Sequence, residues 1–113
     1  MKSIGHIDSH NHLAEVLRNS PERLVQWLKD AQESGIDYFM QGGIDPQNWD
    51  SQQQLKEKYP GQIGLCLGIH PYLAAAQSIT DLEIILDQLA RRLGEEKTKS
   101  GRLAIGEMGL DLR

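Results

Sequence analysis

The stretch IGLCLGIH, residues 63–70, decides the fold class that this 113-residue sequence predicts. Its apolar residues are almost continuous, whereas a strand with one solvated face alternates apolar and polar residues. The stretch therefore predicts a strand over residues 63–69 that is covered on both faces, as strands of parallel sheets are. It ends at His70, and parallel α/β sheets collect their reactive side chains beyond the carboxyl ends of their strands.

Three shorter apolar runs, at residues 4–7, 36–40 and 103–106, predict three further strands around this one. Longer amphipathic segments separate the four runs, so the order along the chain is β-α-β-α-β-α-β. Such alternation favours parallel strands joined by right-handed helical crossovers. We expect an α/β fold with a four-stranded parallel sheet, its strands in sequence order, and three helices.

Start and stop signals place the three helices. The first begins after Ser20, whose hydroxyl can accept a hydrogen bond from a free helix N–H. The second covers residues 47–59, and its glutamines 52–54 are expected to face solvent. The third follows a capping box at residues 80–83 and ends at Gly94, because glycine suits the end of a helix.

The charge and cysteine content exclude several classes of site. The sequence has 12 Lys and Arg against 16 Asp and Glu, a formal net charge of −4, so a polyanion-binding surface made of basic side chains alone is not expected. Phosphate chemistry would instead need a metal ion. Cys66 is the single cysteine, which excludes an internal disulfide and a cysteine-rich zinc cluster. With no signal-peptide or membrane-spanning run in the sequence, we expect a cytoplasmic protein without a membrane partner.

Each predicted strand is followed by a side chain that can bind a metal or exchange a proton. His10 and His12 follow the first strand, Asp45 the second, His70 the third and Glu107 the fourth. Asp45 is more simply explained as the cap of the helix that follows it. His70 is either functional or the cap of a strand end. Such residues after all four strands, at one edge of a parallel sheet, indicate a site.

His10 and His12 give the sharpest local signal. Residues two apart in an extended chain point to the same side, so both imidazoles can reach one cation; two exposed loop histidines are the alternative. Asp8 lies two residues before His10 and therefore points to the same side, so its carboxylate could orient an imidazole without binding the metal itself. Glu107 lies in an apolar, glycine-rich frame, where a lone carboxylate is costly unless a cation or donor compensates it. The pattern predicts a metal site on His10, His12 and Glu107.

Three motifs together resemble the TatD family of metal-dependent hydrolases. They are IDSHNHL at residues 7–13, GIHP at residues 68–71 and IGEMGLD at residues 105–111. The resemblance implies a TIM-type (β/α)8 barrel, which takes about 250 residues. The chain is therefore expected to be a single partial domain over residues 1–113, with the first four strands and three helices of the barrel and without its carboxyl half.

The resemblance also implies the cofactor and the roles of the residues. One or two divalent ions, Mg, Mn or Zn, would be bound by His10, His12 and Glu107, with Glu107 as the bridge. His70 is implied as a catalytic and substrate-binding residue near the scissile phosphate or the attacking water. Asp8 and Asp111 are the candidate carboxylates that support these ligands.

The implied reaction is phosphodiester hydrolysis on DNA or another phosphodiester, and 3′-to-5′ trimming of DNA is the best-known activity of the family. Two cations about 3.5–4 Å apart can activate a water and neutralise the developing phosphate charge. In a half-barrel, however, the first and fourth strands are the outer ones, and their ends need not converge. The sequence thus predicts at most one weakly held cation, on His10 and His12, with Glu107 contributing only if the sheet curves fully.

Two alternative functions stay open. The half-barrel could be catalytically inactive and act as an interaction module, since its open sheet edges invite self-association. It could also belong to another binuclear, amidohydrolase-like enzyme acting on an amide or ester, because His-x-His opens many such barrels. Glu107 argues against that second alternative, because those enzymes commonly bridge their metals with a modified lysine, as the family pattern implies.

Overall fold

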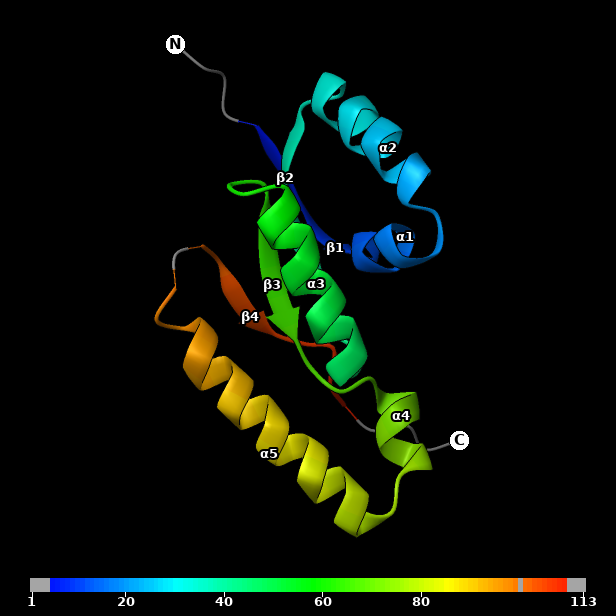
Figure 1. Ribbon diagram of the computed structural model, residues 1–113, viewed down its shortest axis with the longest axis vertical. Coiled ribbons are helices and arrows are strands. Elements are labelled where there is room, and N and C mark those ends of the chain that lie inside the picture. Colours follow the sequence, from blue (N-terminus) through cyan, green and yellow to red (C-terminus); the bar gives the residue numbers. More distant parts are fainter. Residues whose placement is uncertain (1–4, 100, 110–113) are drawn as a thin grey trace.

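The computed structural model describes residues 5–99 and 101–109 of the chain. Within these ranges helices and strands alternate along the sequence (Figure 1). The elements are β1 (His6–Asn11), α1 (Leu13–Asn19), α2 (Pro21–Glu33), β2 (Ile36–Gln41), α3 (Pro46–Lys58), β3 (Ile63–Leu67), α4 (Pro71–Ala76), α5 (Ile79–Glu96) and β4 (Leu103–Ile105).

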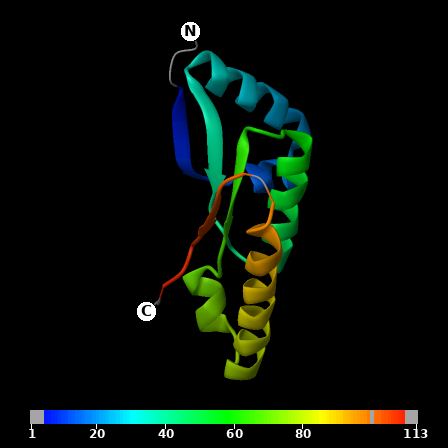
Figure 2. The ribbon, with the colours of Figure 1, turned by 90° about the vertical axis from the view of Figure 1, so that its left-hand side faces the viewer.

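The four strands form one parallel sheet in the order β1-β2-β3-β4. This confirms the predicted topology, which is that of the first half of a TIM-type barrel. Figure 2 shows α2, α3 and α5 on one face of the sheet and no helix over the opposite face of the described residues. The strands thus expose one face, and their carboxyl ends share one edge.

The boundaries of two strands differ from the prediction by more than one residue. The first strand was expected at residues 4–7, but β1 begins at His6 and continues to Asn11; Ile4 lies outside the described residues. Pairing with β2 extends as far as Asn11 opposite Gln41, because backbone pairing does not need apolar side chains at an edge strand. β3 ends at Leu67, two residues before the predicted end. Because β1 continues to Asn11, His10 lies in a strand and not in a loop.

The structure contains five helices in its described part, not the three predicted. The additional helices, α1 and α4, have only seven and six residues. Neither is long enough to show a helical repeat of apolar residues in the sequence. None of the helices in the described ranges combines the length and apolar character needed to cross a lipid bilayer.

The predicted signals for helix ends were partly wrong. The hydroxyl of Ser78, not a capping box at residues 80–83, accepts a hydrogen bond from the Asp81 N–H at the start of α5. The same helix passes through Gly94 and ends at Glu96, because glycine can also adopt helical angles. Ser20 precedes α2 as expected but makes no side-chain cap hydrogen bond.

The core consists of two clusters of buried apolar side chains between the sheet and its helices. One joins α1, α2 and α3 to β2 and β3 and contains Leu13, Leu24, Leu28, Phe39, Leu55 and Ile63. The other joins α3 and α5 to β3 and contains Trp49, Leu65, Leu67, Ile69 and Leu89. Helix α3 contributes to both clusters and therefore links the two halves of the sheet.

Gln52 of α3 is fully buried, contrary to the expectation that residues 52–54 face solvent. Its Oε1 accepts a hydrogen bond from the Cys66 N–H at 2.9 Å, and its Nε2 donates to the Cys66 carbonyl at 2.8 Å. Strand β2 pairs with β3 only as far as Met40 opposite Gly64. The amide of Gln52 therefore replaces the neighbouring strand where that pairing stops.

Replacing Gln52 with Ala should lower the free energy of unfolding by about 2–4 kcal/mol, because two buried backbone groups lose their partner and each costs about 1–3 kcal/mol. Gln54, two residues further along and exposed, provides the control. Gln54→Ala should change the free energy of unfolding by less than about 0.5 kcal/mol. Urea unfolding followed by circular dichroism measures both. Equal effects of the two substitutions would contradict the assigned role of Gln52.

Candidate metal centre

Four side chains meet at the carboxyl edge of the sheet. His10 is in β1, His12 precedes α1, His70 precedes α4 and Glu107 follows β4. Potential ligand atoms of His10, His12 and Glu107 all lie within 4.8 Å of one another. The ends of the outer strands need not converge in a half-barrel, but here the side chains at these two ends do meet. The sheet curls tightly enough to bring the two ends together.

The geometry of this cluster suits a divalent cation. Oε2 of Glu107 lies 3.7 Å from Nε2 of His10 and 3.9 Å from Nε2 of His12. Two ligand atoms bound to one tetrahedral zinc ion at about 2.1 Å would be roughly 3.4 Å apart, so small side-chain rotations suffice to bind an ion. Two imidazole nitrogens and a carboxylate oxygen also form a donor set common in catalytic metal sites.

His70 approaches the other oxygen of the same carboxylate. Its Nε2 lies 3.7 Å from Oε1 of Glu107, and its Nδ1 accepts a hydrogen bond from the Tyr72 N–H at 3.1 Å. In a neutral imidazole the nitrogen that does not accept carries the proton. The Nε2–H of His70 therefore faces Glu107 and the space in front of it, where it can donate a hydrogen bond.

The ligands lie over a floor of glycine backbone. A Cβ atom at Gly42 would lie 2.7 Å from Cε1 of His10 and 2.8 Å from Cε1 of His12. At Gly43 it would overlap the Gly106 carbonyl. Only glycine allows such close approach of backbone and side chains. In the sequence this glycine pair follows the second predicted strand closely, and a glycine pair beside a predicted site is a recognisable signal.

Backbone hydrogen bonds fix the loops that carry the site. The N–H of Glu107 donates to the Gly43 carbonyl at 3.0 Å, and the N–H of His70 donates to the Ile44 carbonyl at 2.9 Å. The side chain of Asn48 in turn accepts a hydrogen bond from the Ile44 N–H. The segment after β2 thus connects His70 and Glu107, which are separated by 37 positions in the sequence.

The three aspartates singled out in the sequence have different positions. Asp8 Oδ1 accepts a hydrogen bond from the main-chain N–H of His10 at 3.0 Å; its predicted action on an imidazole stays a prediction. Asp45 caps α3 by accepting a hydrogen bond from the Asn48 N–H at 2.7 Å, as expected. Asp111 lies outside the described residues.

Cys66 lies close to the cluster but does not have the features of a nucleophile. Burial raises the pKa of its thiol, and the nearby negative charge of Glu107 raises it further, while a hydrogen bond with the Gly43 backbone lowers it. Sγ also lies 3.4 Å from the Gly106 carbonyl, to which it can donate. The thiol is therefore protonated at neutral pH.

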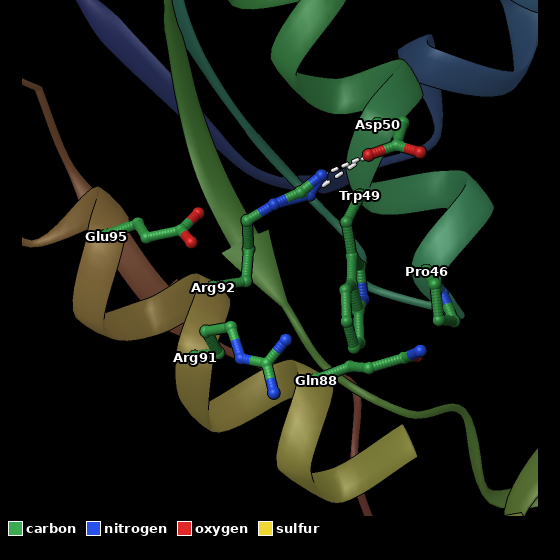
Figure 3. Close-up of a pocket in the computed structure, with 7 residues that line it drawn as sticks. All are labelled: Pro46, Trp49, Asp50, Gln88, Arg91, Arg92 and Glu95. Atoms are coloured by element: carbon green, nitrogen blue, oxygen red, sulfur yellow. Dashed lines mark hydrogen bonds and ion pairs between the residues drawn. The ribbon is translucent and has the colours of Figure 1, made fainter. Parts of the chain in front are cut away.

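A separate pocket lies on the helical side of the sheet, between α3 and α5 (Figure 3). Arg92 of α5 reaches across to pair with Asp50 of α3, and Trp49 forms one wall (Figure 3). The indole Nε1 of Trp49 donates to the Gly68 carbonyl at 2.9 Å. Neither histidine nor cysteine is among the residues that line this pocket.

Comparison with known proteins gave two matches. The model of a family described as TatD related DNase matches residues 7–113. A mouse (Mus musculus) protein named "Putative deoxyribonuclease TATDN3" is 30% identical over 114 residues, which cover 96% of this chain and 36% of the mouse protein. The chain thus spans about a third of the length of this relative.

Replacing Gly42 with Ala should weaken binding of Zn²⁺ by about tenfold or more, the cost typical of disturbing residues that orient metal ligands, because the new methyl group would displace both imidazoles. Gly94→Ala is the matched control. Nothing lies within 4 Å of a Cβ at Gly94, so that variant should bind zinc normally and gain about 0.5–1 kcal/mol of stability from the better helix former. Titration calorimetry and thermal unfolding test the pair; unchanged zinc affinity in Gly42→Ala would contradict the site.

Proposed function

The chain belongs to the family of TatD-related DNases, since the family model matches residues 7–113, and from that premise we propose that its cluster of His10, His12 and Glu107 binds a divalent metal for phosphodiester hydrolysis. One observation supports this proposal above all. Two imidazoles and one carboxylate, from the two outermost strands of the sheet, have their ligand atoms within 4.8 Å of one another. Structural packing alone does not require these polar groups to meet.

The proposed unit is a single partial domain over residues 1–113, which contributes four of the eight strands of a barrel. The sheet order and the parallel direction of every strand pair support this assignment. The active centre is complete only when the ring of strands is complete. The location proposed for the protein is the cytoplasm, where its one thiol stays reduced.

The metal ligands proposed are His10, His12 and Glu107, with Asp8 and Asp111 in support. When bound, one or two ions would activate a water and neutralise negative charge on the phosphate. Two imidazoles suit zinc, whereas magnesium and manganese suit oxygen ligands such as the Glu107 carboxylate and water. The cation also explains how a chain with a net charge of −4 can attract a polyanion.

His70 is the residue proposed to act on the substrate. The Tyr72 N–H fixes its ring by occupying Nδ1, and this directs Nε2–H toward the space in front of Glu107. From there His70 can donate a hydrogen bond to a phosphate oxygen as charge develops on it. Glu107 can accept a hydrogen bond from the attacking water through Oε1, while Oε2 faces the imidazoles of His10 and His12. The two residues thus have complementary roles, one as a donor and one as an acceptor.

DNA is the proposed substrate, trimmed from its 3′ end. The name of the mouse relative, a deoxyribonuclease, supports DNA over other phosphodiesters. The 3′-to-5′ direction is implied by the family resemblance. Oligonucleotides of identical sequence made as DNA and as RNA, and labelled at the 5′ end, distinguish these alternatives through the ladder of products.

Replacing Glu107 with Gln should remove metal-dependent hydrolysis, with a loss of at least about 100-fold, which is the contribution typical of one electrostatic group in an active site. The fold should survive because the amide has nearly the same volume. Glu95, an exposed carboxylate on α5 away from the cluster, gives the control variant Glu95→Gln.

Product formation from the labelled DNA, with Mn²⁺ and with EDTA, is one measurement, and calorimetric metal binding is the other. Metal binding is measured as well because an isolated half-barrel should hydrolyse DNA only slowly. Glu107→Gln with the metal affinity of the unsubstituted chain would refute the ligand assignment. Equal hydrolysis in EDTA would refute metal dependence.

A further inference from the structure

Tyr72 places an aromatic ring beside the candidate metal centre, in the first turn of α4. Its ring centroid lies 4.9 Å from that of the His70 imidazole, and the two planes are tilted by 50°. Its main-chain N–H donates to Nδ1 of the same imidazole at 3.1 Å. Because Nε2 of His70 lies 3.7 Å from Oε1 of Glu107, a single imidazole separates the Tyr72 ring from the carboxylate of the cluster.

Packing of the core does not account for this ring. Helix α4 contains no buried residue, and its Leu73 and Ala74, not Tyr72, are the residues that pack against the second core cluster. Tyr72 is 55% exposed. Covering apolar surface with another apolar surface is favourable, so the ring offers a place where a flat apolar group can pack next to the polar cluster.

The surroundings of α4 come from the described part of the chain on both sides. Strand β3, which leads to α4, pairs with both β2 and β4. On the side of β2, the His70 N–H donates to the Ile44 carbonyl at 2.9 Å. On the side of β4, a Cβ at Gly109 would lie 3.7 Å from Cγ of Pro71, and Figure 1 shows α4 beside the segment that follows β4. The position of Tyr72 therefore does not depend on the outer edges of the sheet.

The chemistry of the cluster indicates which flat group this is. A phosphate at His70 and Glu107 belongs to a nucleotide, and the nearest flat group along the strand is a nucleobase. Proteins that bind single strands commonly combine positive charge with aromatic rings on which bases stack. Basic side chains are outnumbered in this chain, whose net charge is −4, so stacking is the contribution to binding that remains beside a metal ion.

We propose that the ring of Tyr72 stacks on the nucleobase next to the phosphate held at the cluster of His10, His12 and Glu107. The base would extend the existing pair of His70 and Tyr72 rings. This proposal rests on the proposed function, and it narrows the substrate to an unpaired end of a strand, because a base within a duplex is already stacked on its neighbours. Every base has a π-face, so the contact tolerates all sequences.

Binding of a single-stranded oligodeoxynucleotide, labelled at its 5′ end and followed by fluorescence anisotropy with Zn²⁺ and with EDTA, tests the contact. Tyr72→Ala should weaken binding about fivefold or more, the lower end of the contribution typical of one stacked base. Tyr72→Phe should bind almost normally, because it keeps the ring. Val25→Ala is the control, since Val25 is 58% exposed on α2, at the opposite end of the molecule from α4 (Figure 1).

Oligonucleotides that lack one base distinguish stacking from an indirect effect through His70. The missing base is placed in turn at each of the three nucleotides nearest the 3′ end. At one of these positions, loss of the base should weaken binding to the unsubstituted chain and also remove the penalty of Tyr72→Ala, because both changes delete the same contact. An equal penalty of Tyr72→Ala on every oligonucleotide would overturn the proposal, and so would a chain that binds none of them.

Zinc calorimetry on Tyr72→Ala separates this proposal from the proposed function. The variant should bind zinc as the unsubstituted chain does, because the main-chain N–H that fixes His70 is retained and the proposed ligands are His10, His12 and Glu107. A base-dependent penalty in a chain that binds no zinc would refute the metal centre and leave the stacking supported. Zinc binding without any base-dependent penalty would refute the stacking and leave the metal centre supported.

Discussion

The close approach of backbone at the carboxyl ends of β2, β3 and β4 is the constraint on which the structure depends. At Gly43 and Gly68 the chain passes so near the peptide between Gly106 and Glu107 that no side chain could be accommodated. The hydrogen bond from the Glu107 N–H to the Gly43 carbonyl closes this contact. The position of the carboxylate is therefore determined by main-chain atoms, which are less free to move than side chains.

Helix α3 stabilises this arrangement from the opposite face of the sheet through polar side chains that are buried. Asn48 accepts a hydrogen bond from the segment after β2, and Trp49 donates one to the Gly68 carbonyl. Gln52 is hydrogen-bonded to both the N–H and the carbonyl of Cys66. An unsatisfied buried group is expensive, so each of these contacts restricts the backbone to a single position. The carboxyl edge of the sheet is thus stabilised by hydrogen bonding as much as by apolar packing.

The sequence predicted the parts of the fold that depend on apolar pattern and on chemistry. Strand β3 was recognisable because its apolar run is buried, and His10, His12 and Glu107 were chosen as candidate ligands because their donor atoms suit a metal. Helices α1 and α4 were missed because they are shorter than two turns. Gln52 was misassigned because a polar residue buried by hydrogen bonds to backbone has no signature in the pattern. The convergence of the ends of β1 and β4 depends on the curl of the sheet. Backbone contacts determine this curl, and the types of side chain in the sequence do not reveal it.

Trp49 and Trp27 are the two tryptophans of the chain, and their fluorescence comes from two different regions of the structure. The indole of Trp49 is 2% exposed and hydrogen-bonded beside the floor of the site, whereas that of Trp27 is 51% exposed on the outside of α2. Indole emission shifts to longer wavelength as water surrounds the ring. The fluorescence spectrum of the folded protein therefore contains a short-wavelength component from the centre of the sheet and a long-wavelength component from its edge. Quenching by iodide would separate the two without any added label.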